Sequence, residues 1–148
     1  MLRVLIIDDE QVNREFLVRA LKAHGRCLAV GTGEAGLTEH RQALEAGTPF
    51  DLVFLDIMLP GMDGLKTLEL MRAVEAEHAD AFGGQEHAPA QVIITTVLDD
   101  DRLAARAFIQ GRASSYMPKP FRAAQLREEL SKLGLITPAT PPGTEARP

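Results

Sequence analysis

Five short apolar runs alternate with segments whose apolar residues recur at helical spacing, and this alternation limits the folds open to the chain. Strict alternation of strand and helix predicts right-handed crossovers and a parallel sheet with helices on both faces. Five such units are too few for a closed β/α barrel. We therefore predict an α/β fold: a doubly wound, five-stranded, flavodoxin-like parallel sheet with strand order 2-1-3-4-5. The predicted strands cover residues 3–7, 27–30, 51–55, 92–96 and 114–117.

The helices are predicted from apolar residues that recur three and four positions apart. They cover residues 11–24, about 34–46, 65–74, 103–108 and 126–133. Residues 75–89 carry many polar residues and two adjacent glycines, so we predict a long loop there and interpret it as an insertion rather than a partner surface. Residues 137–148 contain four prolines and almost no apolar side chains. We predict a disordered tail over 137–148, after one domain at 1–136.

The size and charge of the chain narrow the class of protein. A length of 148 residues fits one domain, and 45% hydrophobic with 25% charged residues is ordinary for a globular protein. The net charge of −5 argues against nucleic-acid binding, which needs an excess of Lys and Arg. Cys27 is the only cysteine, which fits a reducing compartment. With neither a signal peptide nor a long apolar stretch, we expect a cytoplasmic protein without membrane attachment.

Polar side chains follow several of the predicted strands at the point where each strand ends. Asp8 and Asp9 follow the first apolar run, and Asp56 follows the third. Thr96 ends the fourth run, and Lys119 follows the fifth. Because the carboxyl ends of parallel strands meet at one edge of the sheet, we expect these side chains to converge at its topological switch point.

Three carboxylates in one place repel one another unless a cation neutralises them. A hard divalent ion that takes oxygen ligands, such as Mg²⁺, suits the three acids Asp8, Asp9 and Asp56. Lys119 and Thr96 add the donors that an anionic oxygen attached to Asp56 requires. The pattern therefore indicates a magnesium site built to receive a phosphoryl group.

The same residues resemble a known family. The order Asp8-Asp9, then Asp-Ile-Met-Leu-Pro-Gly-Met-Asp-Gly at 56–64, then Thr96, then Lys119-Pro120-Phe121 resembles the receiver domain of two-component response regulators. The likeness covers roughly residues 2–134, and four separated elements agree in order and spacing.

The resemblance implies a role for each matching residue. Asp56 is expected to take a phosphoryl group from a phosphohistidine on a sensor histidine kinase or a histidine phosphotransfer protein. Asp9 is expected to bind Mg²⁺ directly, Asp8 through water, and Met58 through its backbone carbonyl, with Asp56 completing the site. Lys119 is expected to pair with the phosphoryl oxygens.

The resemblance also implies a switch. Thr96 is expected to move towards the phosphoryl group and Tyr116 to rotate with it, which changes the surface around the fourth helix, fifth strand and fifth helix. The peptide between Lys119 and Pro120 is expected to be cis. We expect a stand-alone phosphoacceptor that lacks an output domain and is not an enzyme, apart from slow autodephosphorylation. The downstream partner is not identified, and homodimerisation is left open.

Near the predicted switch, one position departs from the family pattern and another allows a second alignment. Val97 stands where the family usually has a small residue, and we hypothesise that its side chain narrows access to Asp56. An alignment shifted by one residue makes Thr95 the switch in place of Thr96.

Other interpretations compete with the phosphoacceptor. Residues 8–10 are also suited to cap the first helix, whose dipole favours acids. Residues 31–36 satisfy the G-x-G-x-x-G pattern of dinucleotide sites, but they follow the second strand rather than the first, so we predict a turn and helix start. A phosphatase that uses Asp56 as a turnover nucleophile remains the enzyme alternative, although no general acid is evident beside it.

Overall fold

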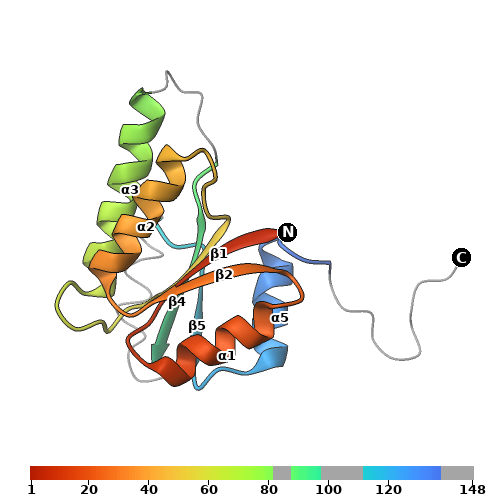
Figure 1. Cartoon of the computed structure of the whole chain (residues 1–148). Coiled ribbons are helices and arrows are strands. Elements are labelled where there is room, and N and C mark those ends of the chain that lie inside the picture. Colours follow the sequence, from red (N-terminus) through yellow and green to blue (C-terminus); the bar gives the residue numbers. More distant parts are fainter. Residues whose placement is uncertain (82–87, 98–111, 138–148) are drawn as a thin grey trace, which may run out of the picture.

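The computed structural model describes residues 1–81, 88–97 and 112–137, which form one parallel sheet and four helices (Figure 1). The strand order is β2-β1-β3-β4-β5, which confirms the predicted doubly wound fold. The strands are β1 (Leu2–Ile7), β2 (Gly25–Val30), β3 (Leu52–Asp56), β4 (Gln91–Val97) and β5 (Ser115–Lys119). The helices are α1 (Gln11–Leu21), α2 (Gly33–Glu45), α3 (Gly64–Ala81) and α5 (Ala123–Lys132).

Helices cover both faces of the sheet, with α2 and α3 on one side and α1 and α5 on the other (Figure 1). Alternate strand residues enter two separate cores: Leu5 and Val53 join the first, while Val4 and Leu52 join the second. The central strand β3 is buried at all five positions, as its continuous apolar character predicts for a strand covered on both faces.

The G-x-G-x-x-G segment forms a turn and the start of α2, as predicted. The Thr32 hydroxyl accepts a hydrogen bond of 3.0 Å from the Ala35 amide and caps α2, which begins at Gly33. A Cβ atom at Gly33 would lie 2.2 Å from the Thr67 hydroxyl, and one at Gly36 would lie 2.3 Å from the Ile7 side chain. The glycines therefore let α2 lie close against α3 and β1, which accounts for the pattern without a nucleotide.

The predicted loop at 75–89 is wrong over its first part, because α3 continues to Ala81. The polar residues at the start of this segment lie on a helix held against α2, while residues 82–87 lie outside the described residues. Glu75 is close to the buried His40, and Glu77 lies 3.6 Å from the Arg41 guanidinium. The segment contains no proline or glycine before Gly83, so nothing in it ends the helix earlier.

Smaller differences concern the ends of elements. The second strand begins at Gly25, two residues before the prediction, and the first helix ends at Leu21 rather than at 24. The predicted helix at 103–108 and nearly all of the predicted tail at 137–148 lie outside the described residues. Within 1–81, 88–97 and 112–137, no helix combines the length and apolar character needed to cross a bilayer.

Candidate functional site

The turn after β3 fixes the position of Asp56. Gly61 adopts a φ of +72°, a conformation that glycine takes without strain. The Asp63 carboxylate accepts a hydrogen bond of 2.8 Å from the Lys66 amide at the start of α3. A Cβ atom at Gly64 would lie 2.3 Å from the carbonyl oxygen of Asp56, so only glycine lets α3 start this close to the strand end. The Pro-Gly-x-Asp-Gly pattern thus builds a tight turn behind the Asp56 carboxylate.

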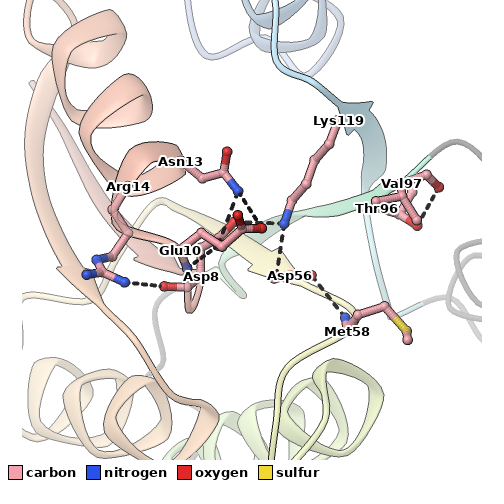
Figure 2. A network of polar contacts seen from close by, with 9 residues as sticks. All are labelled: Asp8, Glu10, Asn13, Arg14, Asp56, Met58, Thr96, Val97 and Lys119. Atoms are coloured by element: carbon pink, nitrogen blue, oxygen red, sulfur yellow. Dashed lines mark hydrogen bonds and ion pairs between the residues drawn. The ribbon is translucent and has the colours of Figure 1, made fainter.

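Asp56, Asp8 and Lys119 come from three strand ends and meet in space, as predicted (Figure 2). The Lys119 ammonium lies 2.9 Å from Asp56 Oδ2 and 3.1 Å from Asp8 Oδ2. Asp56 Oδ1 accepts a hydrogen bond of 3.0 Å from the Met58 amide. Both carboxylates are almost fully buried, with exposures of 1% for Asp8 and 3% for Asp56. One ammonium therefore serves two buried carboxylates.

The shared contact with Asp8 and Asp56 changes the pKa of the Lys119 ammonium. Burial by itself lowers the pKa of the Lys119 ammonium, but the carboxylates of Asp56 and Asp8 outweigh burial and raise that pKa above its ordinary value. Asp8 Oδ2 has no aligned hydrogen-bond donor among the described residues, although the ammonium is 3.1 Å away. The contact is an ion pair, and because Asp8 shares this one ammonium with Asp56, the pair of carboxylates keeps excess negative charge that a cation can neutralise.

Asp8, Asp9 and Glu10 form an acidic cluster whose ligand oxygens all lie within 4.8 Å of one another. Asp8 is buried, while Asp9 and Glu10 are exposed. Glu10 is the N-cap residue of α1, but its side chain makes no capping hydrogen bond. The oxygen donors of the cluster suit a hard divalent cation such as Mg²⁺.

The predicted switch residues lie beside the site without entering it. Thr96 is buried, and its hydroxyl donates a hydrogen bond of 3.1 Å to the Val97 carbonyl rather than facing Asp56 (Figure 2). Thr95 is also buried and pairs with Asp56 across the sheet. The Tyr116 side chain is 43% exposed on β5. The peptide between Lys119 and Pro120 is cis, as predicted.

Sequence reasoning missed three residues of α1 and its N-cap. Glu10 joins the acidic cluster, and the Asn13 amide lies 3.5 Å from Asp8 Oδ1 and 3.4 Å from Glu10 Oε1. The Arg14 guanidinium donates a hydrogen bond of 2.8 Å to the carbonyl oxygen of Asp8. The signal was their position: Asn13 and Arg14 follow Glu10 by three and four residues, which places them on the first turn of the helix beside it.

Comparison with known proteins identifies related sequences and folds. A family model described as the response regulator receiver domain matches residues 4–131. The sensory/regulatory protein RpfC of Xanthomonas campestris pv. campestris is 33% identical over 147 residues, which cover 94% of this chain. The match spans only 18% of the length of RpfC.

A second relative has nearly the same length as this chain. The two-component response regulator ORR41 of Oryza sativa is 30% identical over 135 residues, which cover 91% of this chain and 96% of that protein. Among solved structures, the receiver domain of the histidine kinase CKI1 from Arabidopsis thaliana, complexed with Mg²⁺ and BeF₃⁻, has a TM-score of 0.69. It is 26% identical and covers 88% of this chain and 90% of that chain.

Proposed function

This chain belongs to the response regulator receiver domain family, and on that premise we propose that Asp56 is its phosphoacceptor. A receiver domain acts as a phosphoacceptor in a phosphorelay. The observation that carries the assignment is the buried Asp56 carboxylate at the end of β3, with the Lys119 ammonium 2.9 Å from its Oδ2. The proposed donor is a phosphohistidine on a sensor histidine kinase or on a histidine phosphotransfer protein.

The proposed reaction is a displacement at phosphorus. A carboxylate oxygen of Asp56 forms a bond to the phosphorus atom while the bond from phosphorus to the donor's imidazole nitrogen breaks, and the released imidazole takes up a proton from solvent. Lys119 stabilises the negative charge on the transferring oxygens, since such transfers depend on positioning and charge stabilisation. The Met58 amide orients the Asp56 carboxylate through its hydrogen bond to Oδ1.

The residues present fit a magnesium ion. The buried Asp8 Oδ2 atom has no aligned donor among the described residues, and the Asp9 carboxylate is exposed beside it. We propose that Asp8, Asp9, Asp56 and the carbonyl of Met58 hold the ion. When bound, Mg²⁺ supplies positive charge against the phosphoryl oxygens and the acidic side chains.

Phosphorylation is proposed to act through a change of surface. Thr96 would exchange its hydrogen bond with the Val97 carbonyl for one to a phosphoryl oxygen on Asp56. Tyr116, exposed on β5, would rotate with it and alter the surface that β5 and α5 present. The phosphoryl group adds negative charge and acceptor oxygens, and it shifts the equilibrium only by its different contacts in the two states. We propose that the phosphoryl group leaves Asp56 by slow hydrolysis and that the chain does not turn over a substrate as an enzyme does.

A thermal-shift experiment tests this function against the alternatives. Mg²⁺ with beryllofluoride, which mimics the phosphoryl group, is expected to raise the melting temperature of the chain. The same additives are expected to have a much smaller effect on Asp56→Asn, and Glu69→Gln, an exposed substitution on α3, is expected to respond like wild type. Stabilisation by NAD alone, or an equal response of Asp56→Asn, would overturn the proposal.

A further inference from the structure

We infer that Arg14 is a positioning residue for the magnesium site: its guanidinium holds the main chain of Asp8, and thereby the Asp8 carboxylate, in the geometry that binds the ion. The inference rests on the proposed function. Arg14 lies on the first turn of α1, six residues after Asp8, and its side chain is partly buried.

The main chain of Asp8 is held from two sides. Its amide donates a hydrogen bond of 3.1 Å to the Val30 carbonyl, at the end of the register that pairs β1 with β2. Its carbonyl accepts a hydrogen bond of 2.8 Å from Arg14 Nη1 (Figure 2). The pairing of β1 with β2 ends at this point. The hydrogen bond from Arg14 therefore fixes the main chain of Asp8 where strand pairing no longer does.

The hydrogen bond between Arg14 and Asp8 joins a charged donor to a main-chain acceptor. Because a hydrogen bond from a charged donor is stronger than a neutral one, Arg14 is a firm anchor for this carbonyl.

Fixing the main chain also fixes the carboxylate. Asp8 Oδ1 accepts a hydrogen bond of 2.9 Å from the Glu10 amide, within the same turn that Arg14 secures. This orientation leaves Oδ2 directed to the site, 3.1 Å from the Lys119 ammonium and without an aligned donor among the described residues. Release of the turn would allow both oxygens of Asp8 to leave this arrangement.

The direction in which Mg²⁺ affinity changes on removal of Arg14 distinguishes a positioning role from an effect of its charge. Arg14 is a cation next to an acidic cluster, so its charge repels Mg²⁺. If charge were its only effect, removal of Arg14 would raise the affinity of the site for Mg²⁺. A positioning role predicts the opposite result. Removal of a group that orients a metal ligand weakens metal binding by about 10-fold to 100-fold.

The test measures Mg²⁺ affinity of the full chain by isothermal titration calorimetry at constant ionic strength. Arg14→Met is expected to bind Mg²⁺ about tenfold more weakly than wild type. Arg14→Lys, which keeps the charge and one donor, is expected to fall between them. The matched control is Arg19→Met, which removes the same charge from an exposed position near the end of α1 and is expected to equal or slightly exceed wild type in affinity.

Each outcome decides one of the two claims. Equal or tighter binding by Arg14→Met, with normal binding by wild type, would overturn the positioning role and leave the proposed function intact. Failure of wild type to bind Mg²⁺ would overturn the magnesium site itself. If Arg14→Met does not fold, as judged by its melting curve without Mg²⁺, Arg14→Gln carries the same comparison with the same two readings.

Discussion

Two largely buried charge clusters lie at opposite ends of the sheet, and they differ in how completely their charges are neutralised. The carboxyl-end cluster consists of Asp8, Asp56 and Lys119, where one ammonium serves two carboxylates. The amino-end cluster consists of His40, Arg72 and Glu75, which join α2 and α3 to the segment that enters β4. Among the described residues, the buried side-chain atoms without a hydrogen-bond partner are Asp8 Oδ2 in the first cluster and both ring nitrogens of His40 in the second.

In the amino-end cluster every oxygen of Glu75 has a donor. Oε1 lies 2.7 Å from Arg72 Nη1, and Oε2 accepts a hydrogen bond of 3.1 Å from the Ala90 amide. Arg72 also donates hydrogen bonds of 3.1 Å and 2.8 Å to the Arg112 carbonyl. His40 Nε2 lies 3.1 Å from Oε2, and this contact helps to lower the pKa of the Glu75 carboxyl.

This difference in neutralisation indicates a structural role for the amino-end cluster and a functional role for the carboxyl-end cluster. In the amino-end cluster the Arg72 guanidinium balances the Glu75 carboxylate, so no excess negative charge remains to attract a cation. A cluster with excess buried carboxylate is stable only because an ammonium is shared, and it has capacity for a second cation. The comparison therefore predicts that Mg²⁺ affects variants of one cluster and not those of the other.

The largest effect on stability is expected from Lys119→Met. Removal of the shared ammonium leaves two buried carboxylates unpaired, and the free energy of unfolding is expected to fall by about 3 kcal/mol without Mg²⁺. Added Mg²⁺ is expected to recover much of this loss, because it neutralises the same carboxylates. Chemical denaturation with and without Mg²⁺ measures both effects. A loss that Mg²⁺ does not reduce would break the comparison.

A somewhat smaller effect is expected from Glu75→Ala. The variant loses the charged hydrogen bonds with Arg72 and Ala90, and we expect the free energy of unfolding to fall by about 2 kcal/mol. Mg²⁺ is expected to change this loss no more than it changes wild type. The control is Glu77→Ala on the same helix, whose ion pair with Arg41 is largely exposed and contributes little. Rescue of Glu75→Ala by Mg²⁺ would contradict the structural role.

The pH dependence of stability sharpens the assignment of Glu75. Burial by itself raises the pKa of Glu75, but contacts with His40, Arg72 and Ala90 outweigh it and lower the pKa below its ordinary value of 4.5. A lowered folded-state pKa means that the stabilisation is complete above about 4.5 and is lost as the pH falls through the folded-state value. The stability difference between wild type and Glu75→Ala is therefore expected to shrink below that pH in denaturation curves. A difference that grows in acid would reverse this reasoning.

The smallest effect is expected from Val97→Ala beside the carboxyl-end cluster. The Val97 side chain is 49% exposed, so its removal is expected to leave stability nearly unchanged. If the side chain narrows access to Asp56, the variant is expected to incorporate phosphoryl groups from acetyl phosphate faster than wild type. Unchanged rates of labelling and hydrolysis would refute the hypothesis.

The carboxyl-end cluster was predictable from sequence and the amino-end cluster was not. Asp8, Asp56 and Lys119 follow apolar strands, so the rule that parallel strand ends share an edge was enough to bring them together. His40 and Glu75 are 35 positions apart on two helices, and their contact depends on how α2 packs against α3. The same packing explains why α3 continues through residues that have the polar composition of a loop.

The orientation of the side chains within the site could not be predicted from the sequence. Strand ends place Asp8 at the correct edge, but the direction of its two oxygens depends on the Glu10 amide and the Arg14 guanidinium. These contacts come from the local path of the turn between β1 and α1. The glycines at 33, 36 and 64 were visible in the sequence, yet the close approaches that require them depend on the packing partners.

Mass spectrometry after incubation with acetyl phosphate, with and without Mg²⁺, tests the proposed role of Asp56 directly by locating the phosphoryl group. We predict one Mg²⁺-dependent acyl phosphate on Asp56, with none on Asp8, Asp9 or Glu10. A phosphoryl group on another residue, or equal labelling of Asp56 after Mg²⁺ is chelated, would contradict this prediction.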